Sequence, residues 1–188
     1  TFTYTNFSCY VSRAFLVIKT NRINQKYLTG LLNSKLVVFW LKNKGKMQGS
    51  NFQIDKEPLL NIPIHKPTNE LQELIGKLVD YIIKIKSSNS KINEYTTNNS
   101  LSLMFEEVID AIIYQLYFDD LPDDLKVIEL VEQSVSEARM IISVEEQINL
   151  LFADWNDYNS KLRNRIILQK IQNPDIATIE KYLSNESN

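Results

Sequence analysis

A helical apolar stripe that runs directly into a lysine- and glycine-containing loop constrains this 188-residue chain more than any other stretch. Between residues 28 and 40, large apolar side chains recur at steps of three and four residues, which is the spacing of one helix face. An amphipathic helix packed on a core is the ordinary explanation, and it requires Leu36 and Trp40 to be buried. The stripe consists of Leu28, Leu31, Leu32, Leu36, Phe39 and Trp40.

The loop that follows combines three kinds of residue that suit contact with nucleic acid. Glycines at positions 45 and 49 allow the backbone to approach a ligand closely, because they lack a side chain. Lysine offers positive charge to phosphate, whereas asparagine and glutamine offer the paired donor and acceptor that base edges require. We therefore predict a DNA-binding site made of Lys42, Lys44, Lys46, Gln48, Ser50, Asn51 and Gln53.

Charge is distributed unevenly along the chain, although the net charge is only −2. Residues 1–66 contain ten Lys or Arg and two acidic residues, a net charge of +8, whereas residues 67–188 carry −10. A basic region followed by an acidic one favours a lobe that faces a polyanion and a lobe turned away from it. The alternative explanation is an ordinary solvated surface on which basic and acidic residues happen to be unevenly distributed.

The order of predicted elements favours an α+β fold that is predominantly helical. Residues 8–20 are rich in β-branched and aromatic side chains and predict a strand, and Asn24 can cap a helix that begins near residue 25. Pro63 confines an extended segment at residues 62–64 to a sheet edge, since proline has no N–H for a ladder. Residues 1–66 are thus expected to form a small basic α+β lobe.

Helices are predicted for the rest of the chain. Two apolar stripes separated by a polar turn predict two long helices, the first of which Thr68 would cap. Residues 67–118 are therefore expected to form a helical hairpin that serves as a spacer or docking arm, although the pattern equally allows both helices to pack onto the first lobe. Residues 119–188 are expected to form acidic C-terminal helices, one of them starting at Ser143.

Several kinds of chemistry lack the residues they need. Cys9 is the single cysteine and His65 the single histidine, so the chain cannot form an internal disulfide or an ordinary zinc site. No apolar run approaches the length of a membrane span, and the lone cysteine favours a reducing compartment, so we expect a cytoplasmic protein. Acidic pairs around Pro122 could in principle hold magnesium, although their position at a helix start favours capping. These acids are Asp119, Asp120, Asp123 and Asp124.

Several sequence blocks, in their order, resemble a known family. The segment Leu31-Leu32-Asn33-Ser34-Lys35-Leu36 precedes the lysine loop, and Gln53-Ile54 and Leu60-Asn61-Ile62-Pro63-Ile64 follow it. This order resembles the TaqI-like C-terminal specificity (target recognition) domain of type II restriction-modification enzymes, which is attached to adenine-N6 DNA methyltransferases. Residues 107–117 are similar to the family's closing helix, although Phe118 stands where the family usually has glycine. The resemblance covers roughly residues 8–118.

The resemblance implies that the chain is a DNA sequence-recognition fragment of a larger enzyme, with residues 1–66 as its target-recognition lobe. In this family the methyltransferase lies upstream and holds the flipped adenine with an Asn/Asp-Pro-Pro-Tyr/Phe motif, which Asn173-Pro174-Asp175-Ile176 does not match. The implied partners are double-stranded DNA and the upstream methyltransferase or nuclease domains. The implied cofactor of the parent enzyme is S-adenosylmethionine, with magnesium as a further candidate. No catalytic residue and no cofactor are expected in this fragment.

Two other functions stay open on the sequence alone. A helical protein-interaction module would bind a partner through residues 68–118 and the acidic tail, and DNA binding that weakens with salt would argue against it. An autonomous nuclease would use one of the acidic pairs, and magnesium-dependent cleavage of DNA would establish it.

Overall fold

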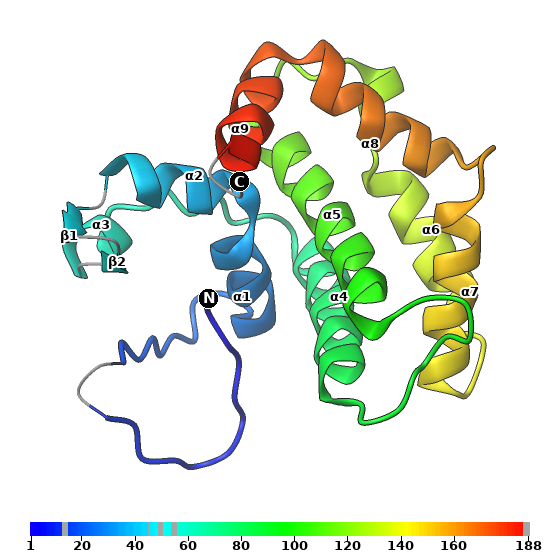
Figure 1. Ribbon diagram of the computed structural model, residues 1–188, viewed down its shortest axis with the longest axis horizontal. Coiled ribbons are helices and arrows are strands. Elements are labelled where there is room, and N and C mark those ends of the chain that lie inside the picture. Colours follow the sequence, from blue (N-terminus) through cyan, green and yellow to red (C-terminus); the bar gives the residue numbers. More distant parts are fainter. Residues whose placement is uncertain (13–14, 45, 49–50, 54–55, 186–188) are drawn as a thin grey trace.

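The computed structural model describes residues 1–12, 15–44, 46–48, 51–53 and 56–185, with the backbone alone for 46–48, 51–53 and 56. Helices dominate this part of the chain, and they surround a central antiparallel pair, α4 and α5 (Figure 1). The elements are, in chain order, α1 (Gln25–Asn33), α2 (Lys35–Lys44), β1 (Lys46–Gln48), β2 (Asn51–Gln53), α3 (Lys56–Leu60), α4 (Asn69–Ser87), α5 (Asn98–Tyr117), the 3₁₀-helix η1 (Asp123–Leu125), α6 (Ile128–Ala138), α7 (Val144–Asn156), α8 (Lys161–Gln172) and α9 (Pro174–Asn185).

The prediction of an α+β fold with a small α+β lobe is wrong, because the expected strands at residues 8–20 and 62–64 do not form in the part of the chain that is described. A strand needs a neighbouring strand for its backbone hydrogen bonds, and no described strand pairs with residues 15–20, so Phe15 and Val17 stay mostly exposed. Within the described residues, the strands are β1 and β2, of three residues each. They pair as an antiparallel hairpin that is too small to form a layer of the fold.

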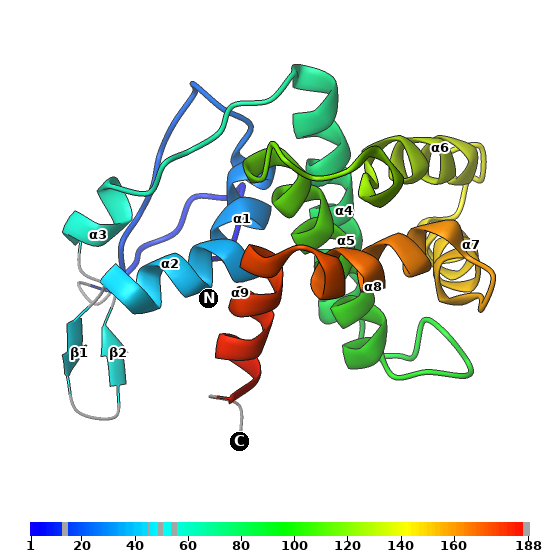
Figure 2. The ribbon, with the colours of Figure 1, turned by 90° about the horizontal axis from the view of Figure 1, so that it is seen from above.

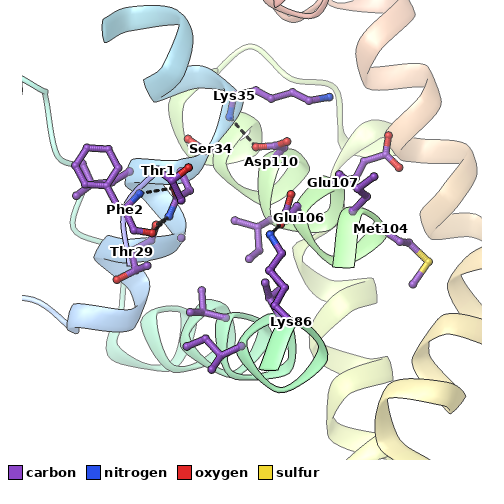
Figure 3. Close-up of a pocket in the computed structure, with 18 of the residues that line it drawn as sticks. Thr1, Phe2, Thr29, Ser34, Lys35, Lys86, Met104, Glu106, Glu107 and Asp110 are labelled. Atoms are coloured by element: carbon purple, nitrogen blue, oxygen red, sulfur yellow. Dashed lines mark hydrogen bonds and ion pairs between the residues drawn. The ribbon is translucent and has the colours of Figure 1, made fainter. Parts of the chain in front are cut away.

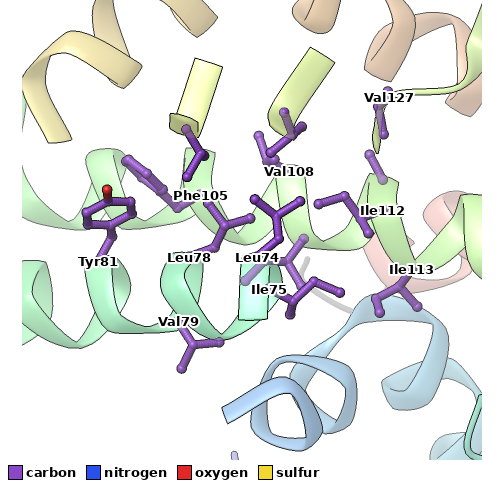
Figure 4. Packing of buried hydrophobic residues seen from close by; sticks show 14 of the residues in the cluster. Leu74, Ile75, Leu78, Val79, Tyr81, Phe105, Val108, Ile112, Ile113 and Val127 are labelled. Atoms are coloured by element: carbon purple, nitrogen blue, oxygen red, sulfur yellow. The ribbon is translucent and has the colours of Figure 1, made fainter. Parts of the chain in front are cut away.

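The core lies between α4 and α5 and in the helices packed on either side of them (Figure 4). Phe105 of α5 is fully buried between Tyr81 and Trp155, with ring centroids 5.7 and 5.1 Å away. On one side α1 packs closely on α4, because Gly30 has no side chain: a Cβ there would lie 3.0 Å from Cγ2 of Ile75. On the other side α6, α7 and α8 complete the same apolar cluster.

The three predicted helix caps are confirmed. The side chains of Asn24, Thr68 and Ser143 each accept hydrogen bonds from backbone N–H groups in the first turn of α1, α4 and α7. These N–H groups have no partner inside a helix, so a capping side chain fixes where the helix begins.

The first helix is broken at Ser34, which the apolar stripe did not predict. Ser34 has extended backbone angles (φ −63°, ψ 151°), and its hydroxyl donates to the carbonyl of Leu31 at 2.7 Å. The break changes which face of the following helix is inward. Within α2, Val37 and Leu41 are buried. Leu36 and Trp40, expected to be buried, are only half-buried.

The segment after α3 is held by tyrosine side chains rather than by a strand. Tyr27 donates to the carbonyl of His65 at 2.7 Å. Tyr117 donates to the carbonyl of Pro63 at 2.7 Å and accepts the N–H of His65 at 2.9 Å. Side chains thus satisfy backbone groups that a sheet would have paired, and Ile62 is buried beside them.

The chain ends beside the region where it began. Helix α9 packs along α2, and the ring of Tyr182 meets the ring of Phe39 edge-on at 5.2 Å. Seen from above, the β1–β2 hairpin lies at one end of the molecule and α6 and α7 lie at the other (Figure 2). A second, smaller apolar cluster joins α5 to α9 and consists of Tyr114, Leu121, Leu125, Ile176 and Ile179.

Candidate nucleic-acid interface

The predicted DNA contacts gather at one projecting end of the molecule, formed by the last turn of α2 and the β1–β2 hairpin (Figure 2). Lys42 is half-buried and Lys44 is exposed in that turn. The C-terminus of a helix carries partial negative charge, so lysines there also stabilise α2. Because β1 begins two positions after the last residue of α2, the end of α2 determines where the hairpin starts.

The hairpin pairs four of the predicted contact residues with one another. In the backbone register, Lys46 lies opposite Gln53 and Gln48 lies opposite Asn51. The sequence predicted a flexible loop here, and the backbone instead forms a two-stranded ribbon. Ser50 and the two loop glycines lie outside the described residues.

A buried carboxylate that the sequence analysis missed holds the start of α2. Oδ1 of Asp110 in α5 accepts the backbone N–H of Lys35, the first residue of α2, at 2.8 Å (Figure 3). Asp110 is only 6% exposed. The Lys35 ammonium reaches Glu180 of α9 at 2.7 Å, and the Tyr114 hydroxyl donates to the other oxygen of Glu180 at 3.1 Å. One signal was available in the sequence: Asp110 is an acid inside the apolar run of residues 108–113.

Burial dominates the electrostatics of this cluster. It raises the pKa of Asp110 to about 7, although the N–H and the ammonium group of Lys35 act in the opposite direction. Burial alone would lower the pKa of Lys35. The hydrogen bond to Glu180 and the charges of the nearby carboxylates outweigh the effect of burial, and the pKa of Lys35 is raised. The pKa of Tyr114 is raised by burial and then by the charges of Asp110 and Glu180. The cluster joins α2, α5 and α9 through the ion pair of Lys35 with Glu180 and the hydrogen bonds of Asp110 and Tyr114.

A hollow of about 1190 Å³ lies between the first residues of the chain, α1, α4 and α5 (Figure 3). Asn33 fixes the chain there, because its amide accepts the N–H of Phe2 and donates to the carbonyl of Phe2, both at 2.8 Å. Of the predicted contact residues whose side chains are described, Lys42 lines this hollow and Lys44 does not. Four residues of α2 line the hollow as well, so it extends along the helix that leads to the hairpin.

The acidic residues of the nuclease hypothesis are surface residues. Asp119 and Asp120 precede η1, Asp123 and Asp124 lie in it, and all four are exposed. The Lys126 ammonium donates to Asp123 at 2.6 Å, and this hydrogen bond lowers the pKa of that carboxyl. In the part of the chain that the structure describes, no three His, Cys, Asp or Glu side chains gather as a metal site.

Among the residues that the structure describes, no helix is both long enough and apolar enough to cross a bilayer.

Comparison with protein families assigns the first third of the chain. Residues 1–64 match the family model described as the TaqI-like C-terminal specificity domain. The match contains α1, α2 and the hairpin, and it ends before α4. It is shorter at its C-terminal end than the expected resemblance, which extended to residue 118.

The curated relatives are methyltransferases and a restriction enzyme. Type II methyltransferase M.HincII of Haemophilus influenzae is 31% identical over 81 residues, which are 43% of this chain and 15% of the relative. Type II methyltransferase M.HindII of Haemophilus influenzae is also 31% identical over 81 residues, 14% of its length. The putative type II restriction enzyme and methyltransferase RM.MjaORFECS2P of Methanocaldococcus jannaschii is 26% identical over 109 residues, 57% of this chain and 9% of the relative.

The chain thus spans between 9% and 15% of the length of these relatives. No solved structure matches it. Residues 1–64 therefore carry a TaqI-like C-terminal specificity domain, as their sequence blocks predicted.

Proposed function

We propose that this chain is the DNA-specificity part of a type II restriction-modification protein with an adenine-specific methyltransferase elsewhere in its sequence. The observation that carries the proposal is the family match over residues 1–64, which contains the projecting α2 and its hairpin. The proposal assigns this chain the choice of DNA site and assigns catalysis to the rest of the protein.

The hairpin suits a base-reading role by its size and composition. A two-stranded ribbon fits the major groove of B-form DNA, where each base pair presents a distinct pattern of donors and acceptors. Gln48, Asn51 and Gln53 occupy the two strands, and their amides can both donate to and accept from base edges. We assign base contacts to these residues together with Ser50.

Lysines at the same end of the molecule suit phosphate contacts. Lys42 and Lys44 lie in the last turn of α2, and Lys46 begins β1. Phosphate contacts fix the position of a protein on the duplex and supply most of its salt-dependent affinity.

Charge favours an approach by this end alone. Residues 101–160 contain fourteen acidic and two basic residues, which would repel a polyanion. Of the helices built from these residues, α5 is central, whereas α6 and α7 lie at the end of the molecule opposite the hairpin (Figure 2). DNA would therefore contact the hairpin end while the acidic helices face away from it or contact the rest of the enzyme.

The cofactors follow from the proposed parent enzyme. Two relatives are named type II methyltransferases, and methyltransferases in general use S-adenosylmethionine, so that cofactor would bind outside this chain. Magnesium would be needed if the parent protein also cleaves DNA, as the name of a third relative suggests for that protein.

The test is the salt dependence of DNA binding by the intact protein and by a variant with Lys42, Lys44 and Lys46 changed to Ala. If each lysine contacts a phosphate, the slope of log affinity against log salt should become shallower by up to about three units. Affinity should fall on every duplex to a similar extent, because phosphate contacts carry no sequence information.

The matched control removes the same amount of charge elsewhere. Lys91, Lys126 and Lys161 are exposed and lie outside α2, the hairpin and α9, so changing all three to Ala should leave the slope close to that of the wild type. Equal slopes in the wild type and the Lys42/Lys44/Lys46 variant would remove these lysines from the interface. A wild-type protein without salt-dependent DNA binding would favour the protein-interaction module instead.

A further inference from the structure

We propose that Asp110 of α5 and Glu180 of α9 are positioning residues for DNA recognition: through Lys35 they fix the direction of α2 and hence of the hairpin. This inference rests on the proposed function for its DNA-binding part. It gives the region after residue 64, which lies outside the family match, a role in recognition.

Helix α2 depends on these polar contacts for its direction because few of its side chains are buried. Two of its ten residues, Val37 and Leu41, are buried. The break at Ser34 also frees its direction from that of α1. A ten-residue helix is roughly 15 Å long, so a tilt of about 10° at its start moves its far end by about 3 Å. That displacement equals the length of a hydrogen bond and would misplace every base contact of the hairpin.

The hold at the start of α2 uses both the backbone and the side chain of one residue. The N–H of Lys35 has no partner within α2, and Asp110 accepts it across 75 positions of sequence. The ammonium group of Lys35 binds Glu180 across 145 positions. Asp110 comes from α5 and Glu180 from α9, so Lys35 is held by two different helices.

A second contact one turn further on fixes the direction of the helix. The edge-to-face pair of Phe39 and Tyr182 joins α2 to α9 beyond Lys35, and Leu183 packs against the same cluster. Two contacts at different points along α2 define an axis, whereas a single contact would allow rotation about it. The position of α9 is itself secured, because Tyr114 of α5 donates to Glu180 and packs with Ile176 and Ile179 of α9 in one apolar cluster.

A role in stability alone is the competing explanation for this cluster. The Lys35–Glu180 ion pair is partly exposed, with side-chain exposures of 36% and 20%, and water screens the attraction in such pairs, so they contribute little net stability. Orientation is a better account, since the cluster lies at the one point from which α2 projects. The two explanations make different predictions for hydrogen exchange in α2 and for the preference of the protein for its recognised DNA site.

The experiment changes Glu180 to Ala in the intact protein and measures hydrogen exchange of the peptide that covers residues 35–44. We expect exchange about tenfold faster there, and unchanged exchange in residues 69–87 of α4. The control is Glu145→Ala, which breaks the Lys84–Glu145 ion pair, also of 2.7 Å, between α4 and α7. That control should leave residues 35–44 unchanged.

DNA binding supplies the second readout. In Glu180→Ala the preference for the recognised site over an unrelated duplex should fall roughly tenfold, while the salt slope stays that of the wild type, because the phosphate-contacting lysines remain. Lys35→Arg should retain most of the preference, whereas Lys35→Ala should lose about as much of it as Glu180→Ala does. A Lys35→Ala/Glu180→Ala double variant should lose no more than either single variant, because both remove the same contact.

Exchange in residues 35–44 that stays at the wild-type rate in Glu180→Ala would overturn the positioning role. Faster exchange with full sequence preference would overturn it as well. The hydrogen-exchange measurement requires no DNA, so it tests whether Glu180 fixes α2 even if the proposed DNA binding is wrong.

Discussion

The first 60 residues and the helices from α4 onward are built in opposite ways. The first region is basic, has a long extended segment with exposed apolar side chains such as Phe7 and Phe15, and ends in a small projecting hairpin. The second is acidic, and its two longest helices bury most of their apolar faces. Helix α1 belongs in packing to the second region, because it lies directly against α4.

This difference separates two tasks that a recognition protein must perform. The helical body supplies the cooperative core, whereas the projecting end tolerates the small core and high charge that contact with DNA requires. On the proposed function, sequence changes at the hairpin would alter the recognised site with little effect on folding. The predictions below test how complete that separation is.

The largest effect is expected from a truncation in the body. Phe105→Ala should lower the free energy of unfolding by about 3–5 kcal/mol, because the ring is fully buried between Tyr81 and Trp155. Phe7→Ala, a change of the same kind at a side chain that is 70% exposed, should stay within about 0.5 kcal/mol of the wild type. Urea denaturation followed by circular dichroism measures both. Similar losses in the two variants would show that the extended segment is packed as firmly as the body.

The next effect depends on pH and lies where the two regions meet. The pKa of Asp110 is raised from its ordinary value of 3.8 to about 7, so the folded protein retains a proton that the unfolded chain releases. The stability due to this group is complete below about pH 4 and is lost as the pH rises through about 7, with a total of roughly 4 kcal/mol at most.

Asp110→Asn should flatten this part of the stability profile, because asparagine can still accept the N–H of Lys35 and does not ionise. Urea midpoints at pH 5 and pH 8 measure the effect, with the exposed Asp120→Asn as the control. The Lys35 and Lys170 ammonium groups and the Glu180 carboxylate also face this site. A profile that keeps its slope in Asp110→Asn would assign the pH dependence to groups other than Asp110.

Substitution of two glycines by alanine should have the smallest of these effects on stability, and it tests how closely α1 packs on α4. Gly30→Ala should destabilise by about 1–3 kcal/mol, because a Cβ would lie 3.0 Å from Ile75 and 3.2 Å from Val79. Gly76→Ala should be neutral or stabilising by up to about 1 kcal/mol, since a Cβ there meets Lys26 at an ordinary 3.5 Å and alanine favours the helix. Thermal denaturation compares them. A neutral Gly30→Ala would mean that α1 is held loosely on the body.

The features that the sequence predicted correctly are local or periodic. The caps Asn24, Thr68 and Ser143 act within one turn, and the stripes of α4 and α5 repeat over many turns, so short windows of sequence contain the whole signal. The family resemblance also came from contiguous blocks, and the family match over residues 1–64 confirms it.

The features that could not be predicted from the sequence depend on partners far along the chain. Residues 10–18 have the composition of a strand, but a strand forms only with a neighbour, and composition cannot supply one. The break at Ser34 is stabilised where Asp110 accepts the next N–H, 75 positions away. Likewise, nothing near Lys35 in the sequence indicates Glu180, which lies 145 positions away.

The central claim is that DNA meets the hairpin end and not the acidic helices, and site-specific crosslinking tests it most directly. A photoreactive side chain is placed either at position 51 in β2 or at position 132, an exposed site in α6, and the intact protein is irradiated with a labelled duplex. We predict a crosslink from position 51 that disappears as salt is raised, and none from position 132. A crosslink from position 132 with none from position 51 would contradict the account.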